Sequence, residues 1–284
     1  MKHTVRLADG RIVPAIGLGT WYLGENPVSW HRELEALRTG IKEGMTLIDT
    51  AEMYGSGRSE RLVGEAISGM DRESLFVVSK VLPQNAGKGR IFSSCRASLK
   101  RLGTGYLDLY LLHWRGGVPL SETVACMEEL KKEGLIRAWG VSNFDIEDME
   151  DLWSVKNGRN CLINQVLYHP GSRGIEFSLL PWMEAHSVAL MAYCPLAQGG
   201  RLRQGLMESP AVREIAKAHG ATPAQVLLAW AIRNKKTIAI PRSASPAHTR
   251  ENALADQLVL SPSELESIDS FFPAPSRKTY LDIQ

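Results

Sequence analysis

Cysteine is scarce in this chain. The 284 residues include four cysteines, Cys95, Cys126, Cys161 and Cys194, which are far apart and form no Cys-x-x-Cys pair. Small disulfide-stabilised domains and zinc-thiolate sites both need several cysteines at close spacing. We therefore expect four buried thiols in a protein of the reducing cytosol, with no resident metal.

An excess of charge and a long apolar run are also missing. Lys and Arg total 33 against 31 Asp and Glu, a formal net charge of +2, so the chain lacks the basic field that attracts nucleic acids or anionic membranes. Its beginning has no apolar segment like that of a signal peptide, and the strongest apolar run, residues 226–232, is far shorter than a membrane span. We therefore expect a cytoplasmic protein that binds neither nucleic acid nor membrane, and nothing indicates an obligate protein partner.

What the chain does have is a repeat of short apolar runs with the character of buried strands. They begin near Ile16, Leu47, Leu75, Leu107, Ile136, Leu162, Val188 and Thr237. All intervals but the last span roughly 26 to 32 residues, about one βα unit, and the segments between them have helical periodicity. Eight alternations predict an α/β protein with a single (β/α)8 (TIM) barrel domain over residues 1–284. An Asp-Gly turn at residues 9–10 predicts an N-terminal hairpin that closes the barrel floor.

Helix starts are also marked. Thr222-Pro223 and Ser261-Pro262 each place a hydroxyl before a proline, which is typical of a capped first turn. Helices are expected at residues 210–219 and 223–233, between the last two strands.

Three of the apolar runs end on an ionisable residue. Asp49, Lys80 and His113 stand where such runs stop, and Tyr54 follows shortly after Asp49. Catalytic groups of a barrel stand at the carboxyl ends of its strands, where charge is not expected as core filling. We predict that Tyr54 donates a proton and that Lys80, held charged by Asp49, lowers the pKa of the phenol. His113 would position an incoming carbonyl oxygen beside it. Alone, each residue has a structural explanation, such as a buried Asp-Lys salt bridge.

Polar and aromatic residues end the later strands. Ser142, Asn143 and Gln165 supply hydroxyl and amide groups, which suit a carboxamide that both donates and accepts hydrogen bonds. Tyr193 offers a face on which a flat ring can stack. Arg242 stands after the last strand and before a predicted helix, where a guanidinium and backbone amides suit a phosphate group. These residue types fit a dinucleotide cofactor.

The motifs around these residues resemble, in order, those of the aldo-keto reductases. They are Gly17-Leu18-Gly19-Thr20-Trp21, Leu47-Ile48-Asp49-Thr50-Ala51-Glu52-Met53-Tyr54-Gly55, Ser79-Lys80, Leu112-His113-Trp114, Gly140-Val141-Ser142-Asn143-Phe144, Asn164-Gln165 and Ala192-Tyr193-Cys194-Pro195-Leu196. The resemblance implies hydride transfer from a nicotinamide to a carbonyl carbon, with a catalytic tetrad of Tyr54, Lys80, Asp49 and His113. The cofactor contacts that it implies are Gly19, Thr20, Ser142, Asn143, Gln165, Tyr193, Pro195 and Leu196. Residues 165–176 and 195–202 look most like bacterial reductases that act on methylglyoxal and similar small aldehydes.

The segment after the last strand implies NADPH as the cofactor. By the same resemblance, Arg242 and Ser243 hold the adenosine 2′-phosphate, and Glu251 and Asn252 contact the adenine. His248 stands where an arginine is usual, and a neutral histidine supplies one cation fewer. We expect NADPH to be preferred and NADH to be used less well, by a margin that the sequence leaves open.

A substrate pocket is expected above the tetrad. The residues that would line it are Trp21, Met53, Tyr54, His113 and Trp114. An apolar wall over a polar floor suits a small-molecule carbonyl substrate. The tail beyond Phe272 is short, so we expect an open pocket with broad substrate use. Arg115 and Arg201 are interpreted as solvated loop charges.

Two other functions remain as alternatives. A Schiff-base aldolase also uses a lysine at a barrel strand end, but Asp49 would keep Lys80 protonated and therefore not nucleophilic. The fold also resembles nucleotide-sensing β-subunits of potassium channels, non-catalytic proteins that carry an N-terminal extension, whereas this chain enters its hairpin almost directly after Met1. A metal-dependent barrel hydrolase is disfavoured because the first strand has no His-x-His pair and the seven histidines do not cluster.

Overall fold

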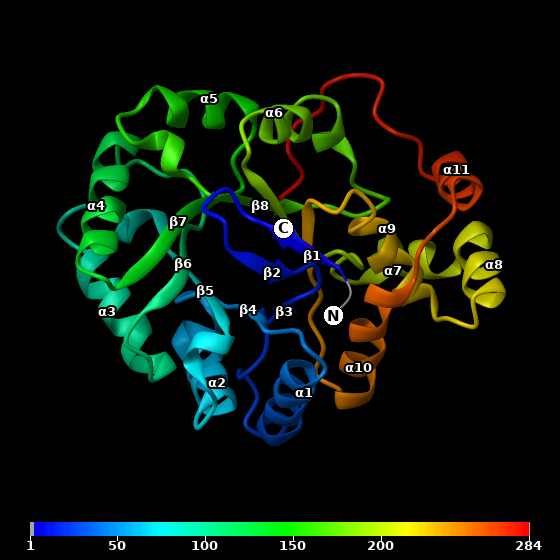
Figure 1. Ribbon diagram of the computed structural model, residues 1–284, viewed down its shortest axis with the longest axis horizontal. Helices are drawn as coiled ribbons and strands as arrows, with labels where there is room; N and C mark the ends of the chain where they lie inside the picture. Colours follow the sequence, from blue (N-terminus) through cyan, green and yellow to red (C-terminus); the bar gives the residue numbers. More distant parts are fainter. Residues whose placement is uncertain (1–2, 284) are drawn as a thin grey trace.

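The computed structural model describes residues 3–283, and its centre is an eight-stranded parallel sheet closed into a barrel (Figure 1). In chain order the strands are β3 (Leu18–Gly19), β4 (Leu47–Asp49), β5 (Phe76–Val81), β6 (Leu107–Leu112), β7 (Ile136–Ser142), β8 (Ile163–Leu167), β9 (Ala189–Tyr193) and β10 (Thr237–Ile240). Each strand pairs with the next, and parallel bridges from Ile16 to Ala239 and from Gly19 to Arg242 close the ring. The predicted (β/α)8 barrel is confirmed.

Glycine at position 19 permits this closure. A Cβ atom there would lie 2.6 Å from the carbonyl oxygen of Ile240, a distance that real Cβ contacts do not reach. The first and last strands can therefore approach at this point only because residue 19 has no side chain.

Helices surround the barrel (Figure 1). They are α1 (Trp30–Lys42), α2 (Arg58–Ile67), α3 (Ile91–Leu102), α4 (Leu120–Lys132), α5 (Ile146–Ser154), α6 (Leu179–Ala185), α7 (Gly200–Glu208), α8 (Pro210–Ala218), α9 (Pro223–Ala231), α10 (Pro246–Leu254) and α11 (Pro262–Phe271). Helix α9 contains most of the strongest apolar run, and it is buried almost throughout. The expected caps are present, because Thr222 accepts a hydrogen bond from the Gln225 amide and Ser261 from the Glu264 amide. Helix α7 was not predicted, since its sequence begins with glycine and buries only Leu206.

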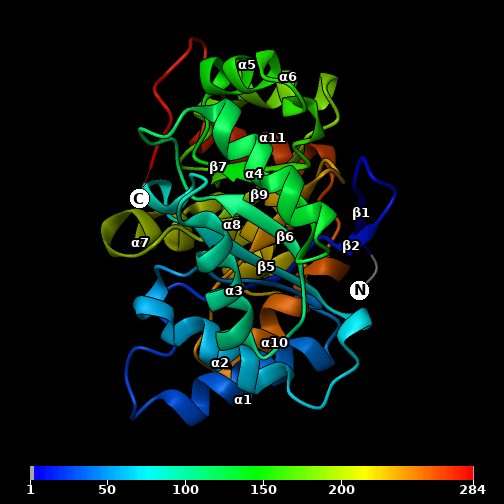
Figure 2. The same ribbon diagram turned by 90° about the vertical axis from the view of Figure 1, so that its left-hand side faces the viewer.

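The N-terminal hairpin closes one end of the barrel. Strands β1 (Thr4–Arg6) and β2 (Ile12–Pro14) pair in antiparallel register across a turn in which Gly10 has φ +89°. Figure 2 shows the hairpin on one side of the barrel and α7 with the chain's C-terminal end on the other. Arg11 of the hairpin donates a hydrogen bond to the carbonyl of Asp108, near the start of β6. The hairpin therefore lies at the amino ends of the strands.

The four cysteines form no disulfide, and three of them are buried while Cys194 is partly exposed. Within residues 3–283, no group of histidine, cysteine, aspartate and glutamate side chains has the arrangement of a metal site. Over the same span, no helix has the length and apolar character needed to cross a membrane.

Candidate active site

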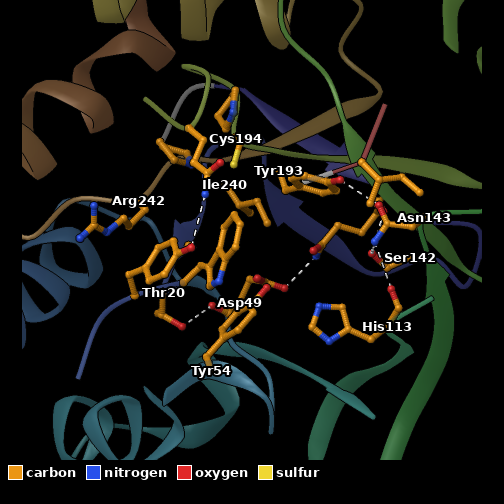
Figure 3. Close-up of a pocket in the computed structure, with 18 of the residues that line it drawn as sticks. Thr20, Asp49, Tyr54, His113, Ser142, Asn143, Tyr193, Cys194, Ile240 and Arg242 are labelled. Atoms are coloured by element: carbon orange, nitrogen blue, oxygen red, sulfur yellow. Dashed lines mark hydrogen bonds between the residues drawn. The ribbon is translucent and has the colours of Figure 1, made fainter. Parts of the chain in front are cut away.

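A cavity of about 610 Å³ opens at the carboxyl ends of the barrel strands. Figure 3 shows side chains from widely separated parts of the chain converging on it. The sequence-predicted residues that line it are Gly19, Thr20, Trp21, Asp49, Met53, Tyr54, His113, Trp114, Ser142, Asn143, Gln165, Tyr193, Pro195, Leu196 and Arg242. Lys80 lies beneath its floor, whereas Ser243, His248, Glu251 and Asn252 do not contribute to its lining.

The floor of the cavity is built around the fully buried ammonium of Lys80. Its Nζ donates hydrogen bonds to Asp49 Oδ2 at 2.7 Å, to the Thr50 carbonyl at 2.9 Å and to the Tyr54 hydroxyl at 3.0 Å. An ammonium has three N–H groups, so all of them are used. The Tyr54 oxygen accepts from Lys80 and keeps its own O–H proton for an acceptor in the cavity.

Asp49 is held in place by hydrogen bonds to its side chain and to its backbone. Its Oδ1 accepts a hydrogen bond from Gln165 Nε2 at 2.8 Å, and its backbone carbonyl accepts one from Thr20 Oγ1 at 2.9 Å. The Gln165 NH₂ group is thus engaged with the carboxylate, also contacting the sulfur of Met191 at 2.8 Å. Toward a bound ligand Gln165 can present its carbonyl oxygen, an acceptor.

Burial sets the protonation states of these groups. It raises the pKa of Tyr54 well above the ordinary value of 10, and the Asp49 charge raises it further. The predicted shift of this pKa to below its ordinary value is therefore wrong, because the cost of removing a phenolate from water is the largest contribution. Burial also lowers the pKa of Lys80 and raises that of Asp49, while the attraction between the two charges opposes both changes. Tyr54 stays protonated at neutral pH.

His113 is neutral in this setting. Burial, followed by the Lys80 charge, lowers the pKa of its imidazole to about 2. Its ring stands edge-on to Tyr54, with centroids 5.7 Å apart and an interplanar angle of 74°. A neutral imidazole carries one N–H donor, so beside Tyr54 it can hold an oxygen without competing for the proton.

The polar groups at the ends of β7 and β8 also bind each other. Asn143 Nδ2 donates to the His113 carbonyl at 3.2 Å, and Ser142 Oγ donates to the Gln165 carbonyl at 2.8 Å. The Tyr193 hydroxyl donates to Asn143 Oδ1 at 2.8 Å, a contact visible in Figure 3. Asn143 has φ +58°, a left-handed conformation that asparagine tolerates better than most residues. These side chains both line the cavity and fasten four neighbouring strand ends.

The opposite end of the cavity is basic and exposed. Arg242 lines it, and its guanidinium makes no hydrogen bond or ion pair with any other residue of 3–283. Ser243 Oγ donates to the Ser245 carbonyl at 3.0 Å and accepts from the Ser245 amide at 3.1 Å, which shapes the turn before α10. Arg250 instead pairs with Glu43 at 3.3 Å on the surface.

Comparison with known proteins decides the family. The model of the aldo/keto reductase family matches residues 15–272. The chain belongs to the aldo/keto reductase family. It is 54% identical over 271 residues to the methylglyoxal reductase YeaE of Escherichia coli K12, an alignment that covers 95% of each protein.

Solved aldo/keto reductase structures agree with this assignment. Two from Klebsiella pneumoniae, one in complex with NADP and acetate and one with NADPH, share 54% sequence identity with this chain. Each superposes with a TM-score of 0.97 over 100% of both chains.

The aromatic wall expected for this aldo/keto reductase is present at the cavity mouth. Trp21 stacks on Tyr22 with ring centroids 4.6 Å apart, and Trp114 lies against His113 at 4.9 Å. Arg115 also lines the mouth, but its guanidinium donates to Asp148 at 2.7 Å and to Asp151 at 2.8 Å. Its charge is therefore paired with two protein carboxylates, while the side chain remains 39% exposed, as expected for a solvated loop charge.

The C-terminal tail contributes to the cavity. Ile283 lines it, a contact that the sequence did not predict. Ser172 Oγ donates to Asp282 Oδ2 at 2.5 Å, and the tail passes so close to Gly174 that a Cβ there would lie 2.4 Å from Thr279 Oγ1. Other lining residues that the sequence did not reveal are Tyr22, Asp148, Cys194, Ala197, Gln198, Arg203, Ile240 and Pro241. Cys194, Ile240 and Pro241 stand at the ends of β9 and β10 but have no ionisable or amide side chain of the kind that marked the other strand ends.

Proposed function

We propose that this aldo/keto reductase reduces small aldehydes and ketones to alcohols with NADPH, and that methylglyoxal is among its substrates. The observation that carries the proposal is the Tyr54 hydroxyl, which is protonated, bonded to Lys80 Nζ at 3.0 Å and exposed to a cavity that also holds neutral His113. The name of the Escherichia coli relative and the nucleotides in the Klebsiella pneumoniae structures support the substrate and the cofactor.

The cavity fits a nicotinamide dinucleotide phosphate. It joins a polar end near Tyr54 to an unpaired cation, Arg242, and the Tyr193 ring between them is half buried. We assign Arg242 and Ser243 to the 2′-phosphate, with His248 a weaker substitute for a second cation. The remaining contacts that we propose are Gly19, Thr20, Ser142, Asn143, Gln165, Tyr193, Pro195 and Leu196 around the nicotinamide and pyrophosphate, and Glu251 and Asn252 at the adenine.

When bound, NADPH supplies the hydride that reduces the carbonyl carbon. Tyr54 transfers its proton to the carbonyl oxygen, and its high pKa means that the proton is present at neutral pH. The Lys80 hydrogen bond stabilises the phenolate as it forms, and Asp49 keeps Lys80 charged for that role. A neutral His113 donates a hydrogen bond that orients the substrate oxygen. The phenolate afterwards recovers a proton from solvent.

Steady-state assays test the proposal. NADPH and NADH are each supplied with methylglyoxal, a nitrobenzaldehyde and an aldose, and nucleotide oxidation is followed by absorbance. We expect turnover of the two aldehydes, with NADPH preferred over NADH. Tight NADPH binding without turnover of any carbonyl would instead favour the nucleotide-sensing alternative. Borohydride trapping of an aldehyde on Lys80 would favour the aldolase.

A further inference from the structure

A buried carboxylate outside the cavity, that of Glu60 in α2, joins this helix to β5 and to α3. Its Oε1 accepts a hydrogen bond from Ser79 Oγ at 2.6 Å, and its Oε2 accepts one from Arg101 Nε at 2.5 Å. Glu60 and Ser79 are fully buried, and neither lines the cavity. Arg101, from the neighbouring helix α3 (Figure 1), also donates to Ser98 Oγ at 3.2 Å. A buried carboxylate must be paired and hydrogen-bonded, and both oxygens of Glu60 are.

The bond between Glu60 and Ser79 connects the two elements that carry the proton donor and its cation. Ser79 precedes Lys80 in β5, and successive side chains of a strand point to opposite faces. Lys80 therefore points into the barrel while Ser79 points outward, toward the helices. On the other side, Glu60 stands in the first turn of α2, and a short 3₁₀ helix, Tyr54–Gly57, runs directly into that turn. One hydrogen bond thus links the segment of Tyr54 to the strand of Lys80.

The turn that follows Tyr54 needs such support. Positions 55 to 57 are all left-handed, with φ of +54°, +55° and +84°. Ser56 is the middle one, and a residue with a Cβ atom keeps this conformation only where the surrounding structure enforces it. A Cβ atom at Gly57 would lie 2.6 Å from Cδ and Nε of Arg101. The arginine that pairs with the buried carboxylate therefore also packs directly against this turn.

We propose that Glu60 is a positioning residue for carbonyl reduction, which with Ser79 and Arg101 fixes the place of the Tyr54 hydroxyl relative to Lys80 Nζ. This inference rests on the proposed function, in which Tyr54 gives up its proton and Lys80 stabilises the phenolate. The hydrogen bond between the two groups is 3.0 Å long. A misplacement of about 1 Å by a change outside the reacting groups can lower a rate roughly 100-fold. A loosened connection should therefore slow proton transfer and leave ligand binding intact.

Ser79→Ala tests the inference, because it cuts the connection to β5 and keeps the pair of Glu60 with Arg101. Turnover of methylglyoxal should fall roughly tenfold in kcat. KM and the dissociation constant of NADPH should stay within about twofold of the wild type, since no residue of the cavity is changed. Ser79→Thr keeps the hydroxyl and should recover most of the lost kcat. Glu60→Ala is a poorer probe, because it leaves Arg101 without its carboxylate and destabilises the whole fold.

Ser98→Ala is the matched control. Ser98 is also a fully buried serine of this network, but it accepts its hydrogen bond from Arg101 rather than donating one to Glu60. The control should keep the wild-type kcat, while urea unfolding measures the loss of stability in both variants.

Three results would overturn the inference: an unchanged kcat in Ser79→Ala, an equal loss of kcat in Ser98→Ala, or a loss of kcat accompanied by an equal loss of NADPH affinity. The last two would show a general structural role. If the wild-type chain reduces no carbonyl, the inference and the proposed function fail together. An active wild type with an unaffected Ser79→Ala variant would remove the inference alone.

Discussion

Two carboxylate–cation pairs lie at opposite ends of the barrel. Asp49 meets Lys80 at 2.7 Å near the carboxyl ends, and Asp108 meets Arg72 at the same distance near the amino ends. Asp108 Oδ2 also accepts the Val77 amide at 2.9 Å, so it joins two strands. Arg72 donates further to backbone carbonyls of neighbouring loops.

The two pairs differ in whether a group that they hold can contact a ligand in the cavity. Arg72 and Asp108 spend their hydrogen bonds on backbone groups, on the Thr104 hydroxyl and on each other, and neither lines the cavity. The Lys80 and Asp49 pair instead holds a phenol, that of Tyr54, which lines the cavity. The end of the barrel at which a charged pair lies thus indicates its role. In barrel enzymes, residues at the carboxyl ends of the strands serve catalysis and residues at the amino ends serve stability.

The sharpest test of this comparison removes one oxygen at the cavity end. Tyr54→Phe should lower the turnover of methylglyoxal at least about 100-fold, because it deletes the proposed general acid. NADPH affinity should change little, since the ring remains. Tyr22→Phe is the control, a second tyrosine of the same cavity whose hydroxyl meets only Gln198, at 3.5 Å. If Tyr54→Phe kept more than about a tenth of the wild-type rate, the catalytic assignment of the cavity end would be wrong.

A substitution at the amino end of the barrel should affect stability and leave turnover unchanged. Asp108→Ala leaves Arg72 without its carboxylate and the Val77 amide without its acceptor, so the free energy of unfolding should fall by about 3 kcal/mol or more. Turnover by the folded protein should be unchanged. Urea unfolding and steady-state kinetics measure the two quantities on one sample. Glu133→Ala, which breaks the exposed pair with Arg96, should cost less than about 0.5 kcal/mol. A large loss of turnover in Asp108→Ala would break the comparison.

This contrast also explains how far sequence alone could go. Both Asp49 and Asp108 interrupt apolar runs, but Asp49 ends its run and Asp108 stands near the beginning, so the repeat of strands was enough to select the right one. The barrel and the convergence of Tyr54 with His113 follow from the same reasoning. The direction in which the pKa of Tyr54 shifts could not be predicted in this way, because it depends on how deeply the fold buries the phenol.

Contacts between distant loops were equally out of reach. Ile283 reaches the cavity through a tail anchored by hydrogen bonds that span 110 residues, such as that between Ser172 and Asp282. Helix α7, which carries Arg203, begins with a glycine and buries only Leu206, so neither the helix nor the arginine was predicted.

Acid should act on the cavity end through two buried histidines. Burial lowers the pKa of His113 to about 2 and that of His169, which follows β8, to about 4, both from 6.5. The unfolded chain binds these protons below about pH 6.5 and the folded chain does not, so stability falls as the pH drops. The contribution of His169 stops growing below about pH 4, and that of His113 continues toward pH 2.

Urea unfolding at pH 7 and pH 5 measures this effect. Replacing either histidine, in His113→Gln or His169→Gln, should reduce the loss of stability between the two pH values by about 1 to 2 kcal/mol. His31→Gln is the control, since this histidine is exposed and pairs only with Glu35 of its own helix, at 3.4 Å. Equal pH dependence in all three variants and the wild type would show that burial at the cavity end does not control protonation.

The smallest expected effect concerns the C-terminal tail, which contributes to the cavity end of the barrel through Ile283. Ser172→Ala removes the donor to Asp282 without altering the tail itself. One such hydrogen bond is worth about 1 kcal/mol, so the detached tail should become roughly five times more populated. Trypsin cleavage after Lys278 should accelerate by that factor. KM should change more for the nitrobenzaldehyde than for methylglyoxal, because a bulkier substrate extends further toward the cavity wall that includes Ile283.

Two further variants decide whether the hydrogen bond itself is responsible. Asp282→Ala should reproduce the effect, and combining it with Ser172→Ala should add little, since both changes remove the same bond. Tyr280→Ala, in the same tail but 96% exposed, should leave cleavage and KM as in the wild type. If Ser172→Ala altered neither cleavage nor KM, the tail would be held by its other contacts, those of Thr279 with Gly174 and of Lys278 with Glu147. The cavity mouth would then be as rigid as the amino end of the barrel.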